Sequence, residues 1–320
     1  MRSLSGASLA LTAVLAFSFV GCAKVGEIKA KKAFKSANQA YQAQDYKKAA
    51  GFYEEAVAAD PNLAQAYFYL GNSYDNLYKP SKKGDPDNDA LLTKAVENYQ
   101  RAAEKLSASD DPANKKLGTL SLQYLVASYG PDKLNDPAKA EPVVQRMIQL
   151  EPGEPANYFA LAKIYEDAGN YEQAEAALLK ARDAHPKDTA VYMQMAAFYN
   201  RQGRFDKTME ALNQRASQDP HNPEGYYTIA VYYWDKTFRD KALNDATRHE
   251  YINSGMEAVN KAISIKPDYL EAIVYKGLLL RLEANMEKDR KKQADLLKEA
   301  DALRDRAKAL QKSKTQGAGD

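Results

Sequence analysis

The chain has 320 residues, of which 45% are hydrophobic and 28% are charged. This balance is typical of a folded protein and excludes a disordered chain. The formal net charge is only +2, so the strong positive charge that nucleic-acid binding requires is missing, and we expect no nucleic acid among the partners. The single cysteine excludes an internal disulfide bond.

The N-terminal segment indicates targeting rather than folding. Arg2 precedes an apolar stretch over residues 4–20, which ends in the sequence Phe19-Val20-Gly21-Cys22. This pattern is typical of a secretory signal peptide, here residues 1–21. The last four residues resemble a bacterial lipobox, with Phe19 where leucine is usual. That resemblance implies that Cys22 becomes the lipidated (palmitate-bearing) mature N-terminus. Because Ala23 rather than aspartate follows Cys22, the resemblance also implies the outer membrane, facing the periplasm.

A short tether over residues 22–29 separates the lipidation site from the first helical pattern. An extended chain spans at most ~3.5 Å per residue, so we expect the first helices to lie close to the bilayer. The apolar run is also close to the length of a transmembrane helix, and an uncleaved membrane anchor is therefore the alternative to a lipoprotein.

Residues 155–220 contain two segments in register. The closing prolines, Pro186 and Pro220, are 220 − 186 = 34 residues apart. The matched pairs between the segments are Tyr158 and Tyr192, Leu161 and Met195, Ala162 and Ala196, Tyr165 and Tyr199, Gly169 and Gly203, and Leu178 and Leu212. This period, with large, small and turn residues at fixed positions, resembles the tetratricopeptide repeat.

Each feature of the repeat has a physical reason. Tyr158, Leu161 and Tyr165 share one face of a first helix. Ala162 must be small because a second helix crosses there, and a larger side chain would overpack the crossing by roughly 1–3 kcal/mol. Gly169 tolerates the positive φ of a turn. A single helix pair cannot bury its own apolar face, so pairs must stack.

The resemblance extends, less strictly, over residues 30–312. It implies an all-α fold, a right-handed superhelical solenoid of antiparallel helix pairs with about seven repeats. Breaks in the pattern predict insertions near residues 79–89, 130–136 and 235–250. Residues 313–320 are expected to form a disordered tail.

The sequence contains no constellation typical of a catalytic or metal site. Asp85, Asp87 and Asp89 alternate, but Ala90 and Val96 stand where an EF-hand loop requires glycine and glutamate. We interpret this run as an exposed insertion in which Asp89 caps the next helix. The three histidines have no second ligand at helical spacing, and no motif pairs a nucleophile with a base. We expect no metal, no cofactor and no enzymatic activity.

The remaining candidate for a functional site is a surface that binds a partner. In tetratricopeptide repeats, defined positions of each first helix line a concave groove, and the resemblance assigns these positions to Phe34, Asn38, Tyr41, Phe68, Asn72, Asp75, Phe159, Lys163, Met193, Asn200, Arg201, Tyr227 and Trp234. Asn38 and Asn72 share one position in adjacent repeats, as in repeats that grip chaperone tails. Phe34 and Phe68 replace the lysine of that clamp, so chaperone-tail binding is not expected.

Aromatic residues and methionine mixed with amides and arginine suit the binding of an extended peptide or a helix. The sequence therefore predicts a non-enzymatic, membrane-anchored scaffold of the bacterial cell envelope that binds a protein partner in the groove and serves envelope assembly. Two alternatives stay open. The groove aromatics could stack on sugar rings of a glycan such as peptidoglycan, or on another small molecule. They could also pack against the next repeat or against an insertion.

Overall fold

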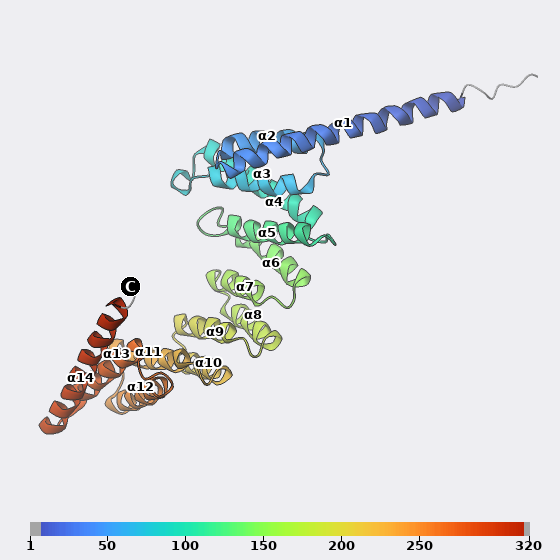
Figure 1. Cartoon of the computed structure of the whole chain (residues 1–320). Coiled ribbons are helices and arrows are strands. Elements are labelled where there is room, and N and C mark those ends of the chain that lie inside the picture. The colour runs from blue at the N-terminus through green and yellow to red at the C-terminus, as the bar shows by residue number, and fades with distance from the viewer. Residues whose placement is uncertain (1–7, 317–320) are drawn as a thin grey trace, which may run out of the picture. The chain divides into compact units, whose positions relative to one another are not determined.

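The computed structural model describes the backbone of residues 8–316 and the side chains of residues 24–314. Within that range the chain forms fourteen α-helices, one short 3₁₀-helix and no strand (Figure 1). Short connections join consecutive helices, and fourteen helices correspond to seven repeats of two helices each. The predicted all-α fold of about seven helical repeats is confirmed.

The chain divides into two compact units, Met1–Asn170 and Tyr171–Asp320. The boundary falls within the fourth repeat, so that its first helix belongs to unit 1 and its second helix to unit 2. Unit 1 contains α1 (Ser8–Gln42), α2 (Tyr46–Ala59), α3 (Ala64–Leu77), η1 (Pro80–Lys82), α4 (Pro86–Leu106), α5 (Pro112–Tyr129), α6 (Pro137–Leu150) and α7 (Pro155–Asp167). Unit 2 contains α8 (Tyr171–Ala184), α9 (Thr189–Arg201), α10 (Phe205–Gln218), α11 (Pro223–Arg239), α12 (Asp245–Ile265), α13 (Leu270–Met286) and α14 (Arg290–Gln316).

Side chains of aspartate or asparagine start many of the helices. Asp111 and Asp136 accept hydrogen bonds from backbone amides in the first turns of α5 and α6, and a proline follows each of them. This combination satisfies free amides and presets φ for the helix. Asp85 caps α4 in the same way, through the amide of Asp87 at 3.0 Å. The prediction that Asp89 is the cap was wrong, because its carboxylate instead accepts from the amide of Gly84 at 3.0 Å.

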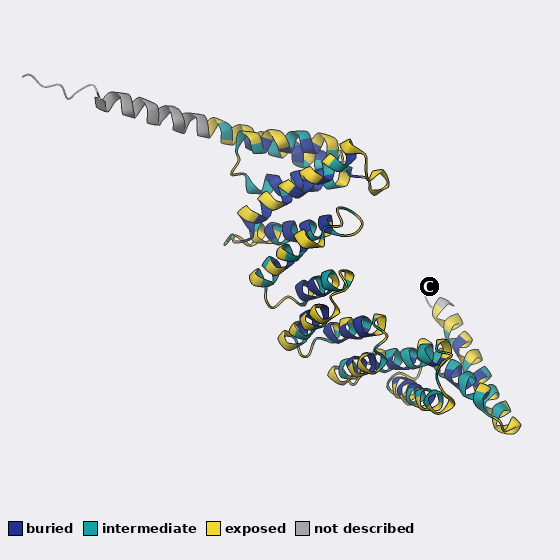
Figure 2. Ribbon diagram, turned by 180° about the vertical axis from the view of Figure 1, so that it is seen from behind, coloured by how far each residue is buried: buried dark blue, intermediate teal, exposed yellow. Residues whose placement is uncertain are grey.

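The strict repeats have the local structure that their pattern predicts. Ala162 and Ala196 are buried, with exposures of 4% and 0%. Gly169 and Gly203 have φ values of 76° and 68°, which only glycine adopts without strain. In Figure 2 the helices carry their buried residues on one side and their exposed residues on the other, as expected of amphipathic helices that stack into an array.

The predicted insertions mostly lengthen helices. Residues 130–136 form the connection between α5 and α6, but residues 79–89 contain η1 and the first turn of α4. Residues 235–250 contain the end of α11 and the start of α12, so only residues 240–244 connect the two helices. These helices have 17 and 21 residues, against 13 and 14 in α9 and α10. The extra residues continue an existing helix because that satisfies their backbone groups at once.

The expected tether also differs, because residues 24–29 lie within α1. Similarly, α14 continues to Gln316, into the predicted tail. The predicted signal peptide (residues 1–21) and Cys22 lie outside the residues whose side chains the structure describes. Among the described residues, no helix combines the length and hydrophobicity needed to cross a membrane.

Polar contacts link neighbouring repeats inside each unit. In unit 1 the hydroxyl of Tyr165 on α7 donates to Glu141 on α6 at 2.8 Å. In unit 2 the hydroxyl of Tyr199 on α9 donates to Glu175 on α8 at 2.9 Å. Both pairs join the second helix of one repeat to the first helix of the next, 24 residues along the chain.

Candidate functional site

The predicted groove residues of the first two repeats lie largely inside unit 1. Phe68 and Asn72 on α3 are 6% and 4% exposed. Phe34 on α1 is half-buried, and its ring centroid lies 5.7 Å from that of Tyr53 on α2 and 6.2 Å from that of Tyr69 on α3. Aromatic rings from three consecutive helices therefore pack together around the predicted groove residue Phe34.

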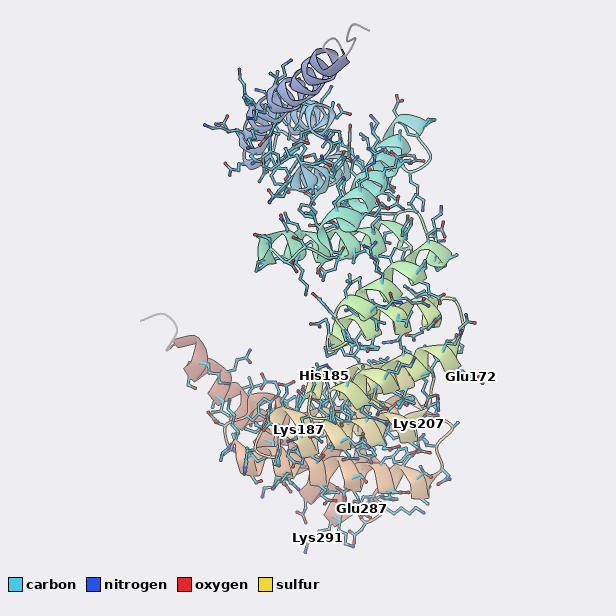
Figure 3. All side chains as sticks on the ribbon, turned by 90° about the vertical axis from the view of Figure 1, so that its right-hand side faces the viewer. Glu172, His185, Lys187, Lys207, Glu287 and Lys291 are labelled. Carbon is cyan, nitrogen blue, oxygen red and sulfur yellow. The ribbon has the colours of Figure 1, made fainter. Side chains whose placement is uncertain are left out.

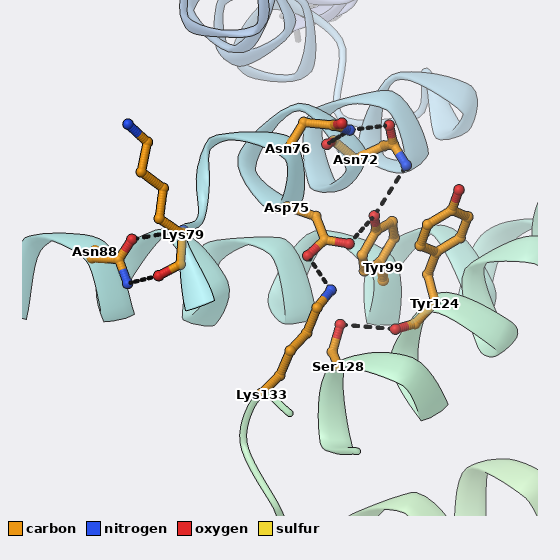
Figure 4. Close-up of polar contacts among 9 residues, drawn as sticks. All are labelled: Asn72, Asp75, Asn76, Lys79, Asn88, Tyr99, Tyr124, Ser128 and Lys133. Atoms are coloured by element: carbon orange, nitrogen blue, oxygen red, sulfur yellow. Dashed lines mark hydrogen bonds and ion pairs between the residues drawn. The ribbon is translucent and has the colours of Figure 1, made fainter. Parts of the chain in front are cut away.

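The two predicted asparagines are hydrogen-bonded within the same unit. Asn38 accepts from the hydroxyl of Tyr53 at 2.6 Å. Asn72 accepts from the hydroxyl of Tyr41 at 2.6 Å. It also donates to the hydroxyl of Tyr99 at 3.3 Å (Figure 4). Burial raises the pKa of Tyr41 to about 12, so this hydroxyl stays protonated and donates at neutral pH.

The connection between α5 and α6 covers a further predicted residue. Lys133 in this connection forms an ion pair with Asp75 on α3, whose side chain is 10% exposed (Figure 4). The hydroxyl of Tyr99 lies 3.5 Å from the same carboxylate. The predicted groove residues of α1 and α3 thus bond and pack within unit 1, which is the arrangement that the second alternative, internal packing, describes.

On α7, the last helix of unit 1, Phe159 is half-buried and Lys163 is exposed. The ammonium group of Lys163 forms an ion pair with Asp167. Both residues of this pair lie near a cavity of about 580 Å³, whose lining includes Val126 and Ile164.

In unit 2 the predicted residues are more accessible. Met193 on α9 is half-buried, and Asn200 and Arg201 at the end of α9 are exposed. On α11, the indole of Trp234 stacks on the ring of Phe238, with 5.0 Å between centroids and 9° between planes. Phe238 is 48% exposed and Trp234 is half-buried, so the stacked pair reaches the surface through Phe238.

Two tyrosines at the start of the neighbouring helix α13 extend this pair. The ring of Tyr275 lies edge-on to Trp234, at 5.5 Å, and to Tyr227, at 5.4 Å. Tyr269, the residue before α13, lies 5.3 Å from Tyr227. We call Tyr227, Trp234, Phe238, Tyr269 and Tyr275 the aromatic face. It joins two first helices of adjacent repeats, and burial raises the pKa of Tyr227 to about 12.

An apolar groove lies beside the aromatic face, between α13 and α14. It has a volume of about 300 Å³ and is lined by Leu270, Val274, Gly277, Leu278, Arg281, Ala300, Arg304, Ala307, Lys308 and Gln311. We call it the α13–α14 groove. A Cβ atom at Gly277 would make ordinary van der Waals contact with α14, at 3.4 Å from the carbonyl oxygen of Ala300. Val274 is 41% exposed.

Charged side chains border the α13–α14 groove. Arg281 on α13 donates to Asp301 on α14 at 2.6 Å, and Arg304 donates to the same carboxylate at 2.8 Å. Lys308, one turn further along α14, lies 4.0 Å from Asp305. The groove therefore has an apolar floor and a rim on which three cationic groups face the carboxylates of Asp301 and Asp305.

The sequence prediction missed Phe238, Tyr275 and Val274. Phe238 follows Trp234 by four residues and so shares its helix face, which is a signal that the sequence does contain. In the seventh repeat, the groove positions of the same register are Val274, Leu278 and Arg281. Tyr275 carries no such signal, because its contact with Trp234 depends on how α11 and α13 pack.

The structure offers little that could hold a metal. In the part of the chain that it describes, no three His, Cys, Asp or Glu side chains are grouped to bind an ion. His185, which follows α8 (Figure 3), is half-buried, and its Nε2 atom has no hydrogen-bond partner among the described groups.

Comparison with known proteins agrees with this architecture. Residues 133–198 match the sequence profile of the tetratricopeptide repeat. The search of curated proteins gives no match. Among solved structures, the C-terminal part of a TPR repeat-containing protein from Cytophaga hutchinsonii has a TM-score of 0.55 and 14% identity, over 84% of this chain and 95% of that chain.

Two other solved structures are similar over much of the chain. A tetratricopeptide repeat protein from Parabacteroides merdae has a TM-score of 0.45 and 15% identity, over 85% of this chain and 98% of that chain. The protein MamA has a TM-score of 0.45 and 16% identity, over 68% of this chain and 98% of that chain. Residues 133–198 therefore match the tetratricopeptide-repeat profile, and the chain shares the helical repeat fold of the Cytophaga protein.

Proposed function

We propose that this protein is a non-enzymatic binding protein whose ligand is an amphipathic helix or peptide segment of another protein, held by the aromatic face and the α13–α14 groove of unit 2. The observation that carries this proposal is the exposure of Phe238 and Val274, at 48% and 41%, on the neighbouring helices α11 and α13. Leaving two large apolar side chains in water beside an apolar groove is unfavourable unless a partner covers them.

The composition of this surface favours a protein ligand. Tryptophan and tyrosine dominate the energetics of protein interfaces, where they fill pockets near the centre of the contact. A groove between two helices accepts the apolar side of a third helix, whose anchors recur every three to four residues. The rim residues Arg281, Arg304 and Lys308 would then lie beside acidic groups on the ligand, which contribute orientation more than affinity.

The glycan alternative finds less support. Phe238 covers one face of the Trp234 indole with nearly parallel rings, and a sugar ring needs an open aromatic face for stacking. Thermal unfolding with and without peptidoglycan fragments tests this alternative, since a ligand at 100 times its dissociation constant adds about 2.7 kcal/mol.

We also propose that Cys22 is lipidated and that the protein acts in envelope assembly at the periplasmic side of the outer membrane. These proposals rest on the sequence pattern of residues 1–23. Replacement Cys22→Ser should leave an uncleaved precursor or release the protein from the membrane. Full membrane retention with unchanged mobility, or no incorporation of labelled lipid into the wild-type chain, would refute the lipid anchor.

Trp234 provides a direct assay of ligand binding, because it is the only tryptophan in the chain. Helical peptides selected from a displayed library against the full-length protein are titrated while the tryptophan emission is recorded. We expect Phe238→Ser and Val274→Asp each to weaken binding at least about tenfold, as the loss of a central apolar anchor does.

The matched control is Tyr171→Ser, since Tyr171 is also an exposed aromatic residue of unit 2, at 48%, but lies outside the aromatic face. Its binding curve should match that of the wild type. Equal affinity of all variants, or an equal loss in the Tyr171 variant, would remove the aromatic face from the binding site.

A further inference from the structure

We propose that the outward side of α1, over residues 24–35, lies on the surface of a bilayer rich in anionic lipid. This inference goes beyond ligand binding in unit 2, and it stands on the geometry of α1 whether or not Cys22 carries a lipid. It assigns unit 1 a defined side that faces the membrane.

Small residues determine which side of α1 faces inward. Ala30 and Ala37 are fully buried. A Cβ atom on Gly26 would lie 2.7 Å from the carbonyl oxygen of Ala59, at the end of α2. Gly26, Ala30 and Ala37 are four and seven residues apart and so share one helix face. Their close packing against α2 fixes the rotation of α1 about its axis, and with it the opposite side.

That opposite side combines exposed apolar and basic side chains. Val25 and Ile28 are 54% and 69% exposed. Among the described residues, no other large hydrophobic side chain is as exposed as Ile28. At 100° per residue, Ile28 points roughly opposite the buried alanines. The same outward side carries four exposed lysines, Lys24, Lys31, Lys32 and Lys35.

The charge of this segment is unbalanced. Residues 24–35 contain five lysines and one glutamate, which gives 5 − 1 = +4, against +2 for the whole chain. Glu27 pairs with Lys31 at 2.6 Å. Within the range of described side chains, no carboxylate lies within ion-pair distance of Lys24, Lys32 or Lys35. These ammonium groups therefore keep their charge available to an external anionic surface.

Two features favour lipid over an acidic protein as the partner. The basic residues of this segment are all lysines, and lysine is depleted at protein interfaces, where arginine is enriched. Lysines around an exposed isoleucine are instead typical of a helix at the membrane interface, where the apolar side chain enters the headgroup region and the ammonium groups contact anionic headgroups. The segment also begins only four positions after the apolar residues 4–20 of the sequence.

A tryptophan placed on this side measures the contact. In the full-length protein with Trp234→Phe, the substitution Ile28→Trp gives a single reporter on the outward side of α1. Gln123→Trp in the same background is the control, because Gln123 is an exposed residue of α5. Emission is recorded with vesicles of brominated phosphatidylglycerol or brominated phosphatidylcholine, whose bromine atoms quench nearby tryptophan.

We expect phosphatidylglycerol vesicles to quench the reporter at position 28 at least about fivefold more than phosphatidylcholine vesicles, because each lysine near an anionic surface contributes about a fivefold preference. High salt should reduce the ratio. Replacing Lys24, Lys31, Lys32 and Lys35 with glutamine should bring it close to one. The reporter at position 123 should show little quenching with either lipid.

A second set of four replacements controls for net charge. Lys288, Lys291, Lys292 and Lys298 lie at the surface of unit 2, and Figure 3 labels Lys291. Their replacement by glutamine should leave the quenching at position 28 unchanged. The proposal would be overturned by equal quenching with both lipids, or by an equal loss of quenching in the second set of variants. It would also be overturned by an emission change that grows with protein concentration in the absence of vesicles, because that result would mean that a second copy of the chain covers α1.

Discussion

Glu175 provides a pH-dependent test of how the repeats of unit 2 are held together. Its carboxylate on α8 accepts from Arg204 at 2.6 Å, from Lys207 at 2.7 Å and from the hydroxyl of Tyr199 at 2.9 Å. Partial burial would raise the pKa of Glu175, but the hydrogen bonds from Arg204, Lys207 and Tyr199 outweigh it and lower the pKa from 4.5 to about 2. Figure 3 labels Lys207 on α10.

The pKa shift sets the size and sign of the effect. A difference of 4.5 − 2 = 2.5 units, at about 1.36 kcal/mol per unit, gives a ceiling of about 3.4 kcal/mol. The Arg204 and Lys207 side chains are 37% and 45% exposed, so water screens the pairs, and we expect about 2 kcal/mol. Because the pKa is lowered in the folded state, this stabilisation is complete above about pH 5 and is lost as the pH falls toward 2.

The test is urea unfolding of the wild type and the Glu175→Gln variant, followed by the emission of Trp234, which lies in the same unit as Glu175. The variant should be less stable by about 2 kcal/mol at pH 7, and the difference should shrink steadily below pH 4.5. Glu172→Gln is the matched control on the same helix (Figure 3), and it should cost only a few tenths of a kcal/mol through the helix dipole. A difference that stays constant from pH 7 to pH 3, or an equal loss in the control, would refute this reasoning.

Three backbone predictions concern unit 1 and are checked by thermal unfolding followed by circular dichroism. Gly118→Ala should cost about 3 kcal/mol, because the new Cβ would lie 2.4 Å from the amide nitrogen of Ser107; wild-type stability would mean that α4 and α5 separate easily. Gly51→Ala, in the middle of α2 with no atom within 4 Å of the new Cβ, should instead add up to about 1 kcal/mol, and a loss would contradict the open space. Gln44→Gly should add about 1 kcal/mol by relieving a φ of 58°, whereas destabilisation would show that the Gln44 side chain makes a needed contact.

The helix pairs could be predicted from the sequence because their signals are local. The close helix crossing within each strict repeat requires a small residue, which is Ala162 or Ala196. The turn within each repeat requires a positive φ, which Gly169 and Gly203 provide. The lengths of the helices in the irregular repeats could not be predicted in the same way. Residues 235–250 break the repeat pattern, yet the backbone there mostly continues α11 and α12, because extending a helix satisfies each added amide and carbonyl group.

The exposure of the groove positions could not be predicted, because exposure depends on neighbours that the pattern does not specify. Asn72 and Trp234 both occupy groove positions, but Asn72 is buried under Tyr41 and Tyr99, while Trp234 is only half-buried, beside the exposed Phe238. Whether a groove position is filled from within is determined by contacts that are distant in sequence, such as the ion pair between Lys133 and Asp75.

The bonds of Tyr165 to Glu141 and of Tyr199 to Glu175 have a consequence for how the array opens. Each hydrogen bond links two successive repeats. Separating those repeats therefore breaks the bond and exposes a glutamate carboxylate and a tyrosine hydroxyl that had been partners. Local unfolding should therefore proceed one repeat at a time, and the free energy of unfolding should increase at each of these hydrogen bonds. Amide hydrogen exchange would show this as protection factors that change in discrete steps along the chain, with residues of one repeat exchanging together.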